Sequence, residues 1–126
     1  MPPFVLDSDD LPNGWERVDG SMVNGEMQHV KYVNRGAVVV DQGTTAPYTR
    51  DVVVLVSPRV VGLMKGPGAR LTWTADNYEE VGVQLAEEIQ AWIDEGNGPY
   101  ASGDLQRRLR EVVEAVGVNA TCPAPV

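Results

Sequence analysis

Apolar residues in the first two thirds of the chain follow patterns typical of β-strands. Residues 51–57 hold four valines and a leucine in close succession, a pattern typical of a central strand covered on both faces. Residues 70–75 alternate polar and apolar side chains, as a strand with one buried face does. Residues 27–33 and 37–41, separated by a short turn containing Gly36, predict a hairpin. Between the last two strands, residues 62–68 contain three glycines and a proline and predict a loop.

The pattern changes to a helical one in the last fifty residues. Asp76–Glu79 resemble a capping box, and Gly96 suits the position just after a helix end. A second helix is expected from Ser102 or Asp104 to a stop at Gly117. Both segments have one apolar stripe with spacings of three and four: Tyr78, Val81, Leu85, Ile89, Trp92 and Ile93 in the first, and Leu105, Leu109, Val112, Val113 and Val116 in the second.

This order of elements predicts an α+β fold. We expect a four-stranded, mostly antiparallel sheet followed by two C-terminal helices packed on one face. Residues 1–20 are expected to form an irregular N-terminal arm whose Trp15 docks on the body of the protein. Residues 21–117 then form the single α+β domain, and residues 118–126, which contain two prolines, form an extended tail.

The valine-rich strand raises the question of what covers the second face of the sheet. Two helices, each with one apolar stripe, cover only one face, so the other face needs the N-terminal arm or another subunit. We therefore predict that the protein self-associates or binds a protein partner. The residues proposed for that interface are Trp15, Val52, Val54 and Val56.

Composition narrows the range of functions. The formal net charge of -8 opposes binding to a nucleic-acid backbone, and the longest apolar run, residues 52–56, is too short to cross a membrane. Two lysines against eight arginines, with an excess of acids, also resemble proteins that stay hydrated at high salt. The N-terminus lacks a signal-peptide pattern, and the single Cys122 excludes an internal disulfide framework. These features favour the cytoplasm or the interior of a viral particle.

Charge is unevenly distributed along the chain. Basic side chains gather in residues 46–75, at Arg50, Arg59, Lys65 and Arg70, whereas residues 76–100 carry seven acids and no base. One alternative function follows: a small anion- or nucleotide-binding module that uses these four cations and the glycine-rich loop within residues 59–70. The phosphate-binding pattern Gly-x-x-x-x-Gly-Lys-Ser/Thr is absent. A second reading pairs the basic segment of one copy with the acidic helix of another.

Catalytic side chains do not form a recognisable set. Asp41, Asp51 and His29 are the candidates for acid–base chemistry, and no motif supports a nucleophile. The acids of the first helix lie two turns apart, about 11 Å, which is too far for one cation. We expect no metal and no cofactor. The sequence therefore favours a non-enzymatic structural or protein–protein interaction subunit of a homo-oligomer or a larger assembly, such as a viral one.

Overall fold

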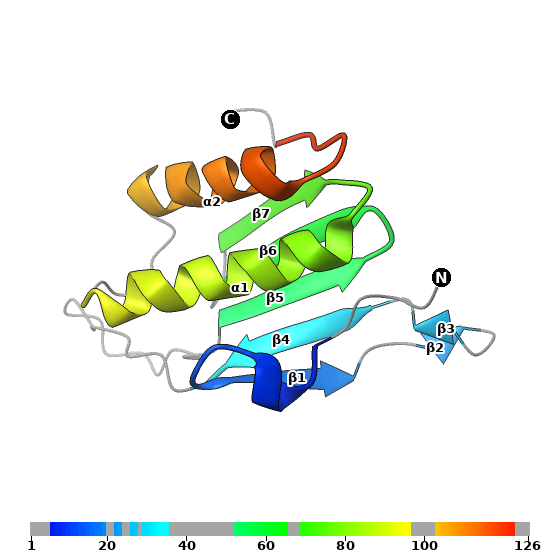
Figure 1. Ribbon diagram of the computed structural model, residues 1–126, viewed down its shortest axis with the longest axis horizontal. Helices are drawn as coiled ribbons and strands as arrows, with labels where there is room; N and C mark the ends of the chain where they lie inside the picture. The colour runs from blue at the N-terminus through cyan, green and yellow to red at the C-terminus, as the bar shows by residue number, and fades with distance from the viewer. Residues whose placement is uncertain are drawn as a thin grey trace.

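A five-stranded antiparallel sheet with two helices on one face organises the protein (Figure 1). The computed structural model describes residues 6–19, 22–23, 26–27, 29–35, 52–65, 69–96 and 103–122. The sheet order is β1-β4-β5-β6-β7, so β5 is its central strand. The strands are β1 (Trp15–Asp19), β4 (Val30–Asn34), β5 (Val52–Ser57), β6 (Val60–Lys65) and β7 (Ala69–Thr74), followed by the helices α1 (Tyr78–Asp94) and α2 (Gly103–Val116). The short strands β2 (Met22–Val23) and β3 (Glu26–Met27) pair with each other, and a 3-10 helix, η1 (Ser8–Asp10), precedes β1.

The α+β class, the antiparallel sheet and the two C-terminal helices on one face are confirmed, with five strands instead of four. Two of these five strands, β1 and β6, were not predicted, and one predicted strand, residues 37–41, lies outside the described residues. The first of the two, β1, lies within the segment expected to be an irregular arm. The second, β6, begins after a two-residue turn in which Arg59 has a left-handed φ of 62°. The prediction of a loop from residue 62 was wrong because Gly62 stands inside a strand of apolar residues that pairs on both sides. Residues 66–68 of the predicted loop lie outside the described residues.

The hairpin predicted around residues 34–36 is not how β4 pairs. One edge of β4 pairs with β1 and the other with β5, both antiparallel, so both of its hydrogen-bonding edges are occupied. The predicted second arm of the hairpin, residues 37–41, lies outside the described residues. The local sequence predicts that residues 37–41 pair with β4, but β1, from the N-terminal segment, occupies that edge of β4 instead.

The core lies between the sheet and the helices. Helix α1 packs over β5 and β6, and α2 packs beside α1 (Figure 1). Gly82 lets the helix approach the sheet closely, because a Cβ atom there would lie 2.3 Å from Val56 Cγ2. Trp15 is 4% exposed and Leu11 joins the same core cluster, so the predicted docking of Trp15 is confirmed. The described residues that precede β1, 6–14, lie on the same face of the sheet as the helices.

The C-terminal tail is fixed to the start of α1. Asn77, which precedes that helix, makes no side-chain cap to it. Its amide group donates to the Val116 carbonyl (2.7 Å), and its Oδ1 accepts from the Val118 N–H (2.6 Å). Thr121 then pairs through its backbone with Thr74 at the edge of β7. The predicted capping interaction is replaced by a connection between two chain segments.

Candidate interaction surface

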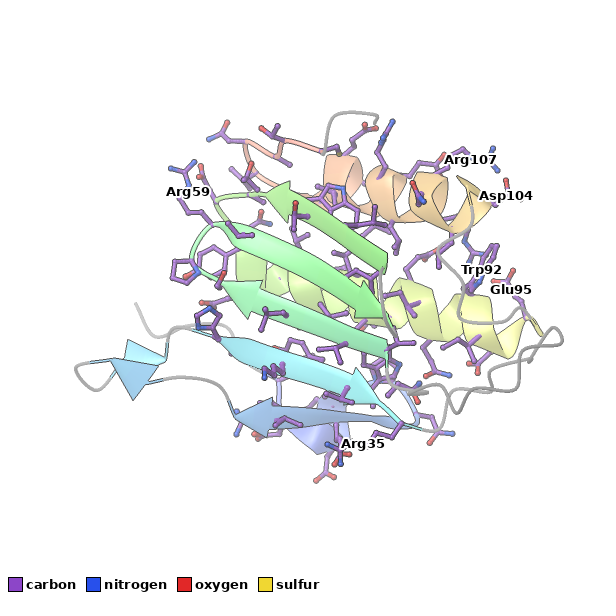
Figure 2. The ribbon with its side chains drawn as sticks, turned by 180° about the vertical axis from the view of Figure 1, so that it is seen from behind. Arg35, Arg59, Trp92, Glu95, Asp104 and Arg107 are labelled. Atoms are coloured by element: carbon purple, nitrogen blue, oxygen red, sulfur yellow. The ribbon has the colours of Figure 1, made fainter. Side chains whose placement is uncertain are left out.

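The face of the sheet opposite α1 and α2 is the candidate interaction surface, called here the open face. Figure 2 shows the molecule from this side, with the strands in front of the helices. The register of the strands assigns alternate residues to this face. Those with described side chains, and Gly62, are Glu16, Val18, Lys31, Val33, Val53, Leu55, Ser57, Val60, Gly62, Thr72 and Thr74. Among the described residues, no helix covers this face.

Apolar side chains lie on three strands of the open face, β1, β5 and β6. Val18, Val53 and Leu55 are half-buried, and Val60 is 37% exposed. Val33 also belongs to this face but is buried, with only 5% of it exposed. The accessible part of the face therefore centres on the strands beside β4. A sheet face exposed only to water usually carries polar side chains, which makes these aliphatic residues a candidate contact surface.

Charge is concentrated on the other layer of the molecule. Glu80, Glu87 and Asp94 are exposed along α1, on the helix side of the sheet. The charged residues with described side chains on the open face are Glu16 and Lys31, and Glu16 pairs with Arg35 at 3.5 Å. The open face is therefore much less acidic than the helix layer.

The two edges of the sheet are less suited to contacts. Strand β1 has the sequence Trp-Glu-Arg-Val-Asp, and charged residues on an edge strand oppose the addition of another strand. At the other edge, Thr121 already occupies part of β7 through two backbone hydrogen bonds with Thr74 (2.8 and 3.1 Å). Of the sheet surfaces that the structure describes, the open face is the one left for a large contact.

The structure places the interface residues proposed from the sequence inside the core. Val52, Val54 and Val56 point to the helix side and are at most 2% exposed, and Trp15 is buried beside them. These four apolar side chains are buried, as the sequence predicts, but α1 and the N-terminal segment of the same chain bury them. The residues that remain accessible are their neighbours on the opposite face, Val53 and Leu55. Sequence alone could not separate the two sets, because both faces of β5 are aliphatic.

The four candidate anion-binding residues do not form one described cluster. Arg59 stands at the turn before β6, where its guanidinium pairs with Asp76 at 3.0 Å. Lys65 ends the same strand, about 20 Å away by strand length, and pairs with Ala69 in the register next to Arg70. Arg50 and the side chains of Lys65 and Arg70 lie outside the described part of the chain. The structure thus brings Lys65 and Arg70 to one end of the β6–β7 hairpin and Arg59 to the other.

The described residues hold little that suggests acid–base or metal chemistry. His29 directly precedes β4, and its Nδ1 is buried without a hydrogen-bond partner among these residues. Asp41 and Asp51 lie outside the ranges the structure covers. Within those ranges, no three His, Cys, Asp or Glu side chains are placed to hold a metal ion. No described helix has the length and hydrophobicity needed to cross a membrane.

A cluster that sequence reasoning missed joins the two helices. The Arg108 guanidinium donates to Glu95 (2.8 and 3.0 Å) and to Glu88 (2.7 Å), and it lies 5.1 Å from the centre of the Trp92 ring. Arg108 belongs to α2, whereas Glu88 and Trp92 belong to α1 and Glu95 directly follows it, so no spacing within one helix indicates this contact. The bidentate bond to Arg108 lowers the pKa of Glu95 below its usual range. The cluster fixes α2 against α1 and thereby supports the sheet from the helix side.

Comparison of the chain with protein-family models, with curated proteins and with solved structures finds no match.

Proposed function

We propose that the protein is a non-enzymatic subunit of a homo-oligomer and that the open face is its contact surface. The observation that supports this proposal is the set of aliphatic side chains Val18, Val53, Leu55 and Val60 on a sheet face that no described helix covers. Burying such side chains against a partner is favourable by about 25 cal/mol per Å² of apolar surface. The second copy is the partner that the charge distribution favours, because face-to-face packing keeps both acidic helix layers on the outside.

The size of the open face sets the expected affinity. Five strands at about 4.8 Å spacing and about 20 Å long give a face of roughly 24 by 20 Å. Two such faces bury on the order of 1,000 Å² in total, at the low end of specific interfaces. We therefore expect a reversible dimer whose dissociation constant lies on the order of micromolar, and not an obligate assembly.

Solution mass as a function of protein concentration tests the proposal. Sedimentation velocity from about 1 to 500 µM should show a shift from monomer to dimer. Val60→Lys places a charge on the open face and should shift the equilibrium to monomer. Val118→Lys is the matched control, because Val118 is also an exposed valine (52%) but follows α2 and belongs to no strand of the sheet. A wild-type monomer at every concentration, or equal effects of the two variants, would overturn the proposal.

A further inference from the structure

Neither the backbone conformation nor the space around position 62 requires a glycine in this strand. It lies in the middle of β6, and it is not among the residues with positive φ. A Cβ atom built there would lie 3.8 Å from Leu71 O and Thr72 Cγ2 and 3.9 Å from Leu55 O, which are ordinary contacts. Glycine weakens a strand interior, and it often marks a place where an outside group approaches the backbone closely. The open face therefore has a notch at Gly62.

Leu55, the side chain that can fill the Gly62 notch of a second copy, lies directly beside Gly62 in its own chain. Leu55 pairs with Gly62 across β5 and β6, so a knob and a notch are neighbours on the same face. The same row continues to Lys31 on β4 and to Thr72 on β7. Four adjacent strands thus contribute one residue each to the row Lys31–Leu55–Gly62–Thr72.

A two-fold axis makes this row complementary to itself. An axis between two facing sheets that runs along the strands, midway between β5 and β6, places β5 of each copy over β6 of the other. Aligned sheets cross at about 30°, so the axis lies roughly 15° from each strand direction. Each Leu55 then stands over Gly62 of the second copy, and each Lys31 ammonium can donate to the Thr72 hydroxyl. A dimer interface of this kind uses the same patch twice.

We infer that two copies pack face to face about this axis, with Leu55 of each copy seated in the Gly62 notch of the other. The inference rests on the proposed function and specifies its partner and its geometry. It also agrees with the charge distribution, since the exposed acids Glu80, Glu87 and Asp94 lie on the far layer of each copy.

Moving the large side chain from position 55 to position 62 tests the inference. Gly62→Leu sets leucine against leucine and should raise the dissociation constant by roughly ten- to hundredfold. Leu55→Ala removes the knob and should also weaken the dimer. The double variant Leu55→Ala/Gly62→Leu moves the knob to β6 and the space to β5, and it should recover most of the wild-type affinity. Ala115→Leu, at an exposed position of α2, adds a leucine on the far layer and should leave the dimer unchanged.

Circular dichroism and the fluorescence of the buried Trp15 and Trp73 verify folding of each variant. Gly62→Ala adds only a Cβ at ordinary contact distances, so it keeps the test informative if Gly62→Leu fails to fold. A wild-type dimer that Gly62→Leu and Gly62→Ala leave unchanged overturns the inference but not the proposed function. The same holds if both single variants weaken the dimer and the exchange does not restore it. A wild-type monomer at all concentrations overturns both.

Discussion

Asn34 of the sheet donates a 2.6 Å hydrogen bond from Nδ2 to Oε1 of Gln90 in α1, and both side chains are buried. Gln90 Nε2 in turn donates to Asp94 at 2.7 Å. Gln90→Met keeps the size of the side chain but removes the acceptor of Asn34 from a buried place. We expect this change to lower the free energy of unfolding by about 1–3 kcal/mol in urea titrations, because the buried amide of Asn34 loses its hydrogen bond to Gln90.

The matched control for this prediction is Gln84→Met, the same substitution on the same helix at a half-buried site. It should change the free energy of unfolding by less than about 0.5 kcal/mol. Equal destabilisation by Gln84→Met and Gln90→Met would show that the connection from β4 to α1 contributes nothing of its own.

The ion pairs of Arg108 give a second prediction. Arg108 bonds the carboxylates of Glu88 and Glu95 and lies against Trp92. Among the described residues, the neighbouring Arg107 forms an ion pair with Asp104 of its own helix alone, and both of those side chains are mostly exposed. Arg108→Met should lower the free energy of unfolding by roughly 1 kcal/mol or somewhat more, since it removes a network between helices. Arg107→Met should have almost no effect. A reversed order, measured by thermal or urea unfolding, would contradict this account of the helix pair.

The lowered pKa of Glu95 predicts how stability depends on pH. Because Arg108 favours the carboxylate of Glu95 in the folded state, this group stabilises the protein above its unfolded pKa of about 4.5. The contribution is lost as the pH falls through the lower, folded pKa. Glu95→Gln should therefore be less stable than wild type at about pH 7, and the difference should shrink at about pH 3. Urea unfolding at both pH values checks this, and a difference that does not depend on pH would contradict it.

Two glycines in regular elements should respond in opposite ways to alanine. At Gly82 a Cβ atom would lie 2.3 Å from Val56 Cγ2 in the packed core, so Gly82→Ala should destabilise the protein by about 1–3 kcal/mol despite a better helix propensity. At Gly62 a Cβ atom would meet its neighbours at ordinary contact distances of 3.8 Å or more, so Gly62→Ala should leave the monomer as stable or slightly more stable. Unfolding at a concentration below that of dimer formation separates this effect from association. Destabilisation by Gly62→Ala there would show a structural need for that glycine.

Much of the fold follows from local sequence. The aliphatic run of β5, the alternation of Leu71, Trp73 and Ala75, and the apolar stripes of both helices predicted elements that the structure confirms. Gly96, with φ of 88°, follows α1 as predicted. These features depend on periodicity within one segment, which the sequence displays directly.

What the sequence could not reveal depends on contacts between distant segments. Strand β1 forms because Trp15–Asp19 pairs with β4, and no local pattern distinguishes it from an irregular arm. Arg108 reaches Glu88 and Glu95 only because the two helices pack side by side. The contact surface was likewise assigned to Val52, Val54 and Val56, which are buried, because an all-aliphatic strand does not show which of its faces the helices cover.

The response of association to salt distinguishes two ways in which copies of the chain can meet. The net charge of -8 makes two copies repel each other, and the exposed acids of α1 lie away from the open face. For face-to-face packing, raising salt from about 0.15 M to about 2 M screens that repulsion and should strengthen the dimer. Pairing of the basic segment 46–75 of one copy with the acidic helix of another should instead weaken with salt. Glu87→Gln removes one negative charge from the helix layer and so reduces the repulsion between copies, and face-to-face packing therefore predicts tighter association of this variant at low salt. Light scattering on a sizing column at both salt concentrations decides between these modes, and a dimer that dissociates at high salt would contradict packing through the open face.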